Sequence, residues 1–89
     1  MSNKSVVSRK EKAEQTRQKI YQSAEELFYR HGFDEVNVDN IVRHAGVAKG
    51  SFYVHFESKN ALIATLIQDY VDRVDMKYQS YLDTFSPEE

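Results

Sequence analysis

The residues with the clearest capacity for chemistry lie in the stretch HAGVAKGSFYVHF, residues 44–56. Five of them are small, polar or cationic and stand among aromatic and aliphatic positions: Lys49, Gly50, Ser51, Tyr53 and His55. Ammonium, hydroxyl and imidazole groups hydrogen-bond to phosphate oxygens and to the edges of bases. A glycine beside them allows a partner to approach the backbone closely. The chemistry that these types favour is polar recognition.

The remaining residues predict no catalytic or metal centre. The chain has no cysteine, no GxSxG motif and no Walker loop, and its carboxylates are scattered over expected solvent-facing positions. His31, His44 and His55 are separated by 13 and 11 residues and form no HxxxH motif. We therefore expect no enzyme activity, no metal and no cofactor.

Charge is distributed unevenly along the 89 residues, whose net charge is −2. Residues 1–19 contain six basic and two acidic residues, whereas residues 60–89 contain two basic and six acidic ones. One end is therefore suited to phosphates, or is simply a solvated basic tail. The longest apolar run, ALIATLI, is too short to span a bilayer, and the lack of cysteine fits a reducing cytoplasm. We expect a cytoplasmic protein without a membrane segment.

The elements that must position the stretch 44–56 are helices. An amphipathic period predicts a first helix that begins near residue 9, where Ser8 and Glu11 have capping-box spacing, or later at Thr16, and that ends at Gly32. A second helix, capped by Asn37, runs over residues 38–45 to Gly46. A third spans about 49–56. A fourth, capped by Ser58, spans about 59–83.

Two short helices joined by a glycine-containing turn are typical of a helix-turn-helix, in which the second helix enters the DNA major groove. Four residues are expected to point inward: Ala45, Val47, Phe52 and Phe56. The five candidate residues of the first paragraph then lie outside. Alternatively, Tyr53 is only an aromatic residue at the edge of the core, and His55 a surface histidine without a task. The predicted fold is all-α, a three-helix bundle of the homeodomain-like type with a long fourth helix.

The fourth helix is too long for its expected partners. At 1.5 Å per residue, 25 residues extend about 37 Å, which three short helices cannot cover. Its apolar stripe comprises Leu62, Ile63, Leu66, Ile67, Tyr70, Val71, Val74, Tyr78, Tyr81, Leu82 and Phe85. The far half of this stripe needs another partner. We therefore expect the chain to be a fragment of a longer protein.

Residues 32–62, GFDEVNVDNIVRHAGVAKGSFYVHFESKNAL, resemble the DNA-binding domain of TetR-type transcriptional repressors, and the resemblance extends over about residues 16–67. It implies that Lys49, Gly50 and Ser51 meet bases or phosphates at the start of the recognition helix, and that Tyr53 and His55 contact the DNA backbone. It also implies phosphate contacts for Lys59, at the start of the fourth helix, and for Asn37. Asn37 stands where the family usually has threonine.

The resemblance further implies a homodimer on a palindromic DNA operator and a missing C-terminal domain that binds a small-molecule inducer. The expected organisation is a basic arm (1–9), a DNA-binding domain (10–59) and the beginning of the missing domain (60–89). The arm either reaches into a minor groove or is a disordered tail. The expected function is ligand-responsive transcriptional repression. The alternative, supported by the acidic total charge and the apolar face of the fourth helix, is a helical protein-interaction module that does not bind DNA.

Overall fold

The computed structural model describes residues 8–84, and side chains as far as residue 80. It contains four helices: α1 (Arg9–His31), α2 (Val38–Ala45), α3 (Lys49–His55) and α4 (Lys59–Thr84). Residues 8–84 contain no β-strand, which confirms the all-α prediction. Each helix begins at the expected residue and ends within one residue of the expected position.

The start of α1 is determined by a reciprocal pair of local hydrogen bonds. The Glu11 backbone N–H donates to Ser8 Oγ at 3.1 Å, and the Ser8 N–H donates to Glu11 Oε1 at 3.2 Å. This capping box satisfies two N–H groups that have no partner inside the helix. The alternative start at Thr16 is wrong, because Thr16 lies inside α1 and its hydroxyl donates to the Lys12 carbonyl. Of the arm expected over residues 1–9, Ser8 and Arg9 belong to the capped helix, and residues 1–7 lie outside the described residues.

Two glycines end the first two helices, as predicted. Gly32 has φ 88° and Gly46 has φ 73°, values that residues with a side chain rarely adopt. At Gly46 the chain forms a Schellman motif: the Val47 N–H donates to the Val42 carbonyl at 3.0 Å, and the Gly46 N–H donates to the Arg43 carbonyl at 3.2 Å. This turn sets the direction in which α3 leaves α2.

The core lies where α1, α2 and α3 meet the first two turns of α4. Its buried apolar residues are Ile20, Ala24, Val36, Ile41, Val42, Phe52, Phe56, Leu62 and Leu66. Of the residues expected to point inward, Phe52 and Phe56 are buried, whereas Ala45 and Val47 are half-buried. Ala13 and His31, which share the apolar period of α1, are exposed. The apolar period of α1 therefore extends beyond the part of α1 that packs against the core.

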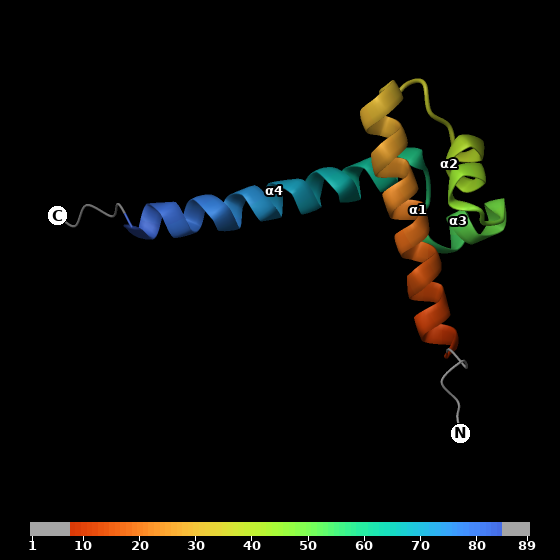
Figure 1. Cartoon of the computed structure of the whole chain (residues 1–89), viewed down its shortest axis with the longest axis horizontal. Helices are drawn as coiled ribbons and strands as arrows, with labels where there is room; N and C mark the ends of the chain where they lie inside the picture. The colour runs from red at the N-terminus through yellow and green to blue at the C-terminus, as the bar shows by residue number, and fades with distance from the viewer. Residues whose placement is uncertain (1–7, 85–89) are drawn as a thin grey trace.

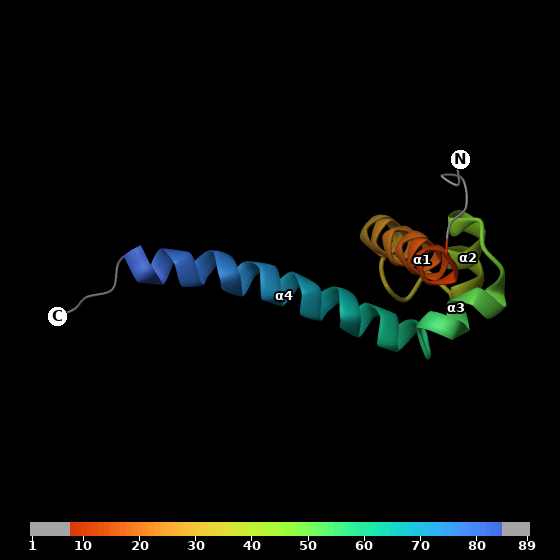
Figure 2. The same ribbon diagram turned by 90° about the horizontal axis from the view of Figure 1, so that it is seen from below.

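The molecule consists of a compact group of helices from which one long helix, α4, projects. In Figures 1 and 2, α1, α2 and α3 cluster at one end, and α4 extends away from them. We call residues 8–66 the head and residues 67–80 the outer segment. Because α4 has 26 residues, it is about 39 Å long. Leu62 and Leu66 belong to the core of the head, so the first turns of α4 pack with the residues of the expected DNA-binding domain.

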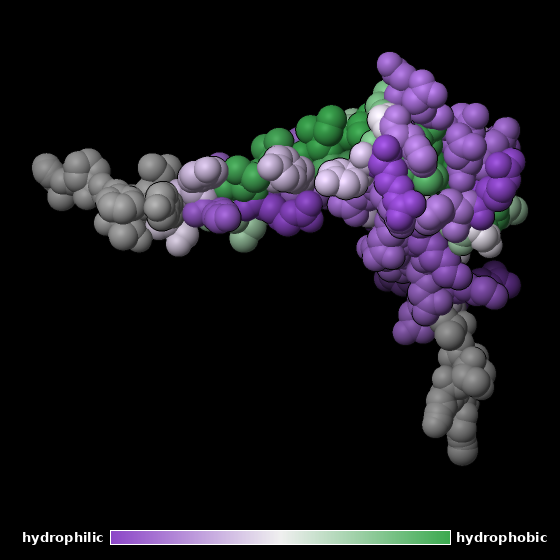
Figure 3. Space-filling view, turned by 45° about the horizontal axis from the view of Figure 1, so that its top comes forward, coloured by the Kyte–Doolittle hydropathy of each residue, from purple (hydrophilic) through white to green (hydrophobic). Residues whose placement is uncertain are grey.

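The apolar stripe of α4 continues along the outer segment, where most of its residues are exposed. Ile67, Tyr70, Val71 and Tyr78 are exposed, and Val74 is half-buried. Figure 3 shows hydrophobic surface along one side of α4 where it leaves the head. The expected contributions of Tyr81, Leu82 and Phe85 lie outside the described side chains. None of the described helices combines the length and apolar character needed to cross a membrane.

A side-chain hydrogen bond joins α1 to the outer segment. The Tyr21 hydroxyl donates to Asp69 Oδ2 at 2.5 Å. Burial of the Tyr21 phenol and this hydrogen bond together raise its pKa to about 12. The contact restrains α4 one turn beyond the buried Leu66.

Candidate nucleic-acid interface

Helix α3, the second helix of the α2–α3 pair, is buried on one side and exposed on the other. Successive residues of an α-helix are turned by about 100°, so residues two positions apart lie on nearly opposite sides. Phe52 and Phe56 are buried against the core. Gly50 and Val54 therefore lie on the side of α3 opposite these two phenylalanines, and both are exposed. α3 is thus a helix held by one apolar side with the other side free for a partner.

One flank of α3 faces α2. Lys49 Nζ lies 3.0 Å from Asp39 Oδ1, an ion pair in which both side chains are more than half exposed. The hydrogen bond and the charge of Asp39 raise the pKa of Lys49. Tyr53, one turn further along α3, is 50% exposed and its ring packs edge-on against Phe52. Sequence reasoning placed Lys49 at this surface but did not identify Asp39 as its partner.

The other flank of α3 faces the first turns of α1. Ser51 and His55 are half-buried and line a groove of about 330 Å³ together with residues of α1. The α1 residues in this groove are Arg9, Lys12, Ala13 and Thr16, besides Val54 on α3. Figure 1 shows that this N-terminal part of α1 extends past the α2–α3 pair. Two cationic side chains of α1 therefore stand beside two hydrogen-bonding side chains of α3.

Asn37 caps α2, as predicted. Its Oδ1 accepts from the Asn40 N–H at 2.8 Å, and Asn40 Oδ1 accepts from the Asn37 N–H at 2.9 Å. Since capping occupies the Asn37 oxygen, only the amide NH₂ of this exposed side chain is free to donate to a phosphate. The predicted phosphate contact of Asn37 stays a prediction.

Lys59 has an intramolecular role that sequence reasoning missed. Its ammonium donates to the Phe33 carbonyl at 2.8 Å and to the Val36 carbonyl at 2.9 Å, and it lies 4.1 Å from the centre of the Phe33 ring. Lys59 thus joins the start of α4 to the link between α1 and α2. One of its three N–H donors is left for a phosphate. Its predicted phosphate contact also stays a prediction.

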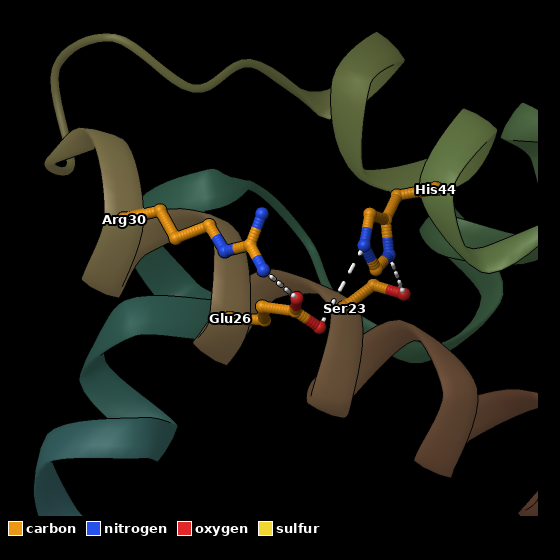
Figure 4. Close-up of polar contacts among 4 residues, drawn as sticks. All are labelled: Ser23, Glu26, Arg30 and His44. Atoms are coloured by element: carbon orange, nitrogen blue, oxygen red, sulfur yellow. Dashed lines mark hydrogen bonds and ion pairs between the residues drawn. The ribbon is translucent and has the colours of Figure 1, made fainter.

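A polar cluster fixes the end of α2 on α1 (Figure 4). His44 Nδ1 lies 2.9 Å from Ser23 Oγ, and His44 Nε2 lies 3.7 Å from Glu26 Oε1. Arg30 pairs with the same Glu26 at 3.2 Å. Ser23 is only 6% exposed, so the cluster positions α2 rather than presenting a nucleophile. In the described part of the chain no three metal-ligating side chains gather.

Val54 is the exposed residue of α3 that sequence reasoning passed over. Its side chain is 76% exposed, more than that of Tyr53. Its position was accessible from the sequence, because a helical wheel with Phe52 and Phe56 inward places Val54 outward. The exposed surface of α3 therefore contains an apolar residue among polar ones.

A helix-turn-helix with an exposed second helix defines a class of nucleic-acid-binding domain. Residues 20–66 match the family described as bacterial regulatory proteins, tetR family. The chain belongs to this family.

Individual relatives are helix-turn-helix regulators. The chain is 37% identical over 73 residues to the HTH-type transcriptional regulator YdgC of Bacillus subtilis, which covers 82% of this chain and 37% of that protein. It is 34% identical over 68 residues to the HTH-type transcriptional repressor KstR2 of Mycolicibacterium smegmatis, covering 76% of this chain and 33% of that protein. The chain therefore spans about a third of the length of these relatives.

A solved structure shares the fold. The crystal structure of a gamma-butyrolactone receptor, described as ArpA-like, aligns with a TM-score of 0.68 and 40% sequence identity. The alignment covers 81% of this chain and 36% of the receptor. The likeness thus extends over most of the chain.

Proposed function

We propose that this chain is the DNA-binding part of a cytoplasmic transcriptional repressor and that α3 is its recognition helix. The observation that supports this most directly is the outward surface of α3. A family of regulators, a helix-turn-helix and a short helix with exposed Lys49, Gly50 and Tyr53 all favour the same partner, duplex DNA. Lysine and tyrosine supply donors to phosphates and base edges.

The surroundings of α3 extend this surface on both sides. On one side α1 adds Arg9 and Lys12, and on the other Asn37 adds an exposed amide. Within α1, the segment Arg9–Lys19 carries five basic residues and two acidic ones, so positive charge is concentrated beside α3 despite the acidic total. Phosphates on both sides of a major groove would thereby find cations or amide donors.

A second part of the proposal concerns the exposed apolar stripe of the outer segment. We propose that residues beyond about 67 belong with a regulatory region that forms a homodimer and binds a small-molecule inducer. Two heads would then occupy successive major grooves, about one helical turn apart, on a palindromic operator. The inducer would act by shifting the population of head separations through α4.

The alternative function is a protein-interaction module, favoured by the exposed Ile67, Tyr70 and Val71. An NMR titration of the chain with a mixed-sequence duplex separates the two. The proposal expects shifts on Asn37 and on residues 49–55 that weaken as salt rises, since phosphate contacts release counterions. Shifts absent there, or confined to the outer segment at every salt concentration, would establish the alternative.

Two variants test the assigned surface. Lys49→Gln and Tyr53→Phe alter exposed side chains, so we expect them to weaken duplex binding while leaving the unfolding transition nearly unchanged. Lys77→Gln, on the outer segment, removes the same charge as Lys49→Gln and is expected to bind like the unmodified chain. Lys59→Ala is a poorer probe, because it also removes two hydrogen bonds to the link between α1 and α2.

A further inference from the structure

We propose that Gly50 and Val54 form a base-reading strip on α3 that recognises the C5-methyl group of a thymine. The two residues are one helical turn apart, opposite the buried Phe52 and Phe56. They are therefore the part of α3 that enters deepest into a groove. The inference rests on the proposed function, because it names the base that the recognition helix reads.

Gly50 has no intramolecular reason to be glycine. Its backbone is not in the positive-φ region, and a Cβ built at this position would have no atom within 4 Å. Glycine in a helix is nevertheless destabilising relative to alanine. What glycine supplies here is space outside the molecule, so that the edge of a base pair can reach the α3 backbone.

Val54 supplies the complementary feature, an apolar side chain about one turn after this gap. A single exposed valine needs no explanation on an ordinary surface. On α3, however, Val54 follows Gly50 by one turn, polar residues of α3 line both flanks, and Val54 also borders the groove shared with Arg9 and Lys12 of α1. In the major groove the thymine methyl is the apolar group that distinguishes base pairs, and an apolar side chain is its natural contact.

The strip also differs from the apolar surface of the outer segment. There, Ile67, Tyr70 and Val71 are neighbours along one stripe, which is typical of contact with another helix. Val54 instead stands at 76% exposure beside Gly50, Ser51 and Tyr53. Its surroundings favour a partner with both polar and methyl groups at its edge, as a thymine–adenine pair has.

The test begins with a duplex selected from a random library by the unmodified chain. Each thymine of that duplex is then replaced singly by deoxyuridine, which removes only the C5-methyl group. We expect one thymine in the half-site at which this replacement weakens binding about four-fold, the loss of one buried methyl-sized group. Val54→Ala is expected to bind the thymine and deoxyuridine duplexes equally, whereas the matched control Val71→Ala keeps the four-fold difference.

Gly50→Ala gives a second, independent readout. An alanine should raise the thermal stability of the chain, because alanine favours helix, and should weaken binding to the selected duplex about ten-fold or more by filling the gap. The two effects have opposite signs, so unfolding cannot account for the lost binding. Unchanged affinity in Gly50→Ala would overturn the proposed close approach.

The possible failures are distinguishable. If no duplex is selected and the chain binds DNA at no salt concentration, the proposed function fails and the base-reading strip fails with it. If a duplex is bound in a salt-dependent manner but no deoxyuridine replacement matters, only the strip is wrong. The strip is equally wrong if Val54→Ala retains the four-fold difference.

Discussion

The head and the outer segment share one helix, α4, yet its apolar residues have opposite surroundings in the two regions. Leu62 is fully buried and Leu66 is 9% exposed, whereas Tyr70 is 63% exposed on the same stripe. The sequence period is continuous across them. An apolar period therefore identifies a face suited to burial, but that face becomes part of a core only where an opposing surface covers it. In the head that surface is α1; beyond residue 66, the Tyr21–Asp69 hydrogen bond joins α1 to the start of the outer segment, while most of the apolar stripe there is exposed.

The charges of the two regions differ as well. The N-terminal turns of α1 are rich in lysine and arginine beside α3, whereas the outer segment carries three aspartates, Asp69, Asp72 and Asp75, against two basic residues, Arg73 and Lys77. Opposite charge at the two ends directs a polyanion to one of them. Helix α4 thus begins in the head, whose charge suits DNA, and continues into the outer segment, whose surface suits a protein partner.

The largest expected effect comes from truncating one stripe residue in each region. Leu62→Ala removes a fully buried side chain and leaves a cavity, so we expect a loss of about 2–5 kcal/mol in the free energy of unfolding. Val71→Ala should change it by less than about 0.5 kcal/mol, because that side chain is 48% exposed. Urea unfolding followed by far-UV circular dichroism measures both. Equal losses would mean that the outer segment is packed in solution.

A smaller effect is expected at the junction where α4 begins. Ser58 Oγ accepts from the Ala61 N–H at 3.0 Å and caps α4. Ser58→Ala should therefore cost about 1 kcal/mol in the free energy of unfolding, and Ser58→Asp, which can still cap, should restore most of it. If aspartate restores nothing, the hydrogen bond from the Ala61 N–H is not what stabilises the start of α4.

The contact between the two regions should be visible as a dependence of stability on pH. The Tyr21 pKa is about 12 in the folded chain against 10.0 for an ordinary tyrosine. Its contribution is therefore fully present below about pH 10 and is lost as the pH rises toward 12. Relative to Tyr21→Phe, the chain should lose stability only in this alkaline range. A parallel decline in both proteins would assign the effect to the other tyrosines.

The smallest expected effect sharpens the contrast in charge. Asp39→Asn removes a carboxylate that pairs with Lys49 at the surface of α3, so we expect duplex affinity to rise a few-fold as Lys49 becomes available to phosphate. Asp75→Asn removes the same charge from the outer segment and should leave the affinity nearly unchanged. Titration of both variants by fluorescence anisotropy at one salt concentration makes the comparison. Equal increases would mean that only net charge matters.

Local sequence signals were sufficient to predict the helices and their ends. Ser8 with Glu11, Asn37 at α2 and Ser58 at α4 each satisfy backbone groups three residues away, and Gly46 permits a left-handed turn. Such devices act over a few residues, so the boundaries could be read before any fold was known. The outward position of most of α3 was predictable from its helical spacing relative to Phe52 and Phe56. The family resemblance was predictable from the motif in residues 32–62.

The contacts that the candidate residues make could not be predicted from the sequence, because they depend on the packing of distant segments. Asp39 reaches Lys49 across two helices, and Lys59 bonds to carbonyls of Phe33 and Val36, more than 20 residues away. Nor could the period alone show that burial along α4 stops after Leu66. These features depend on which segments lie opposite one another, and that is set by packing of the whole head rather than by neighbours in sequence.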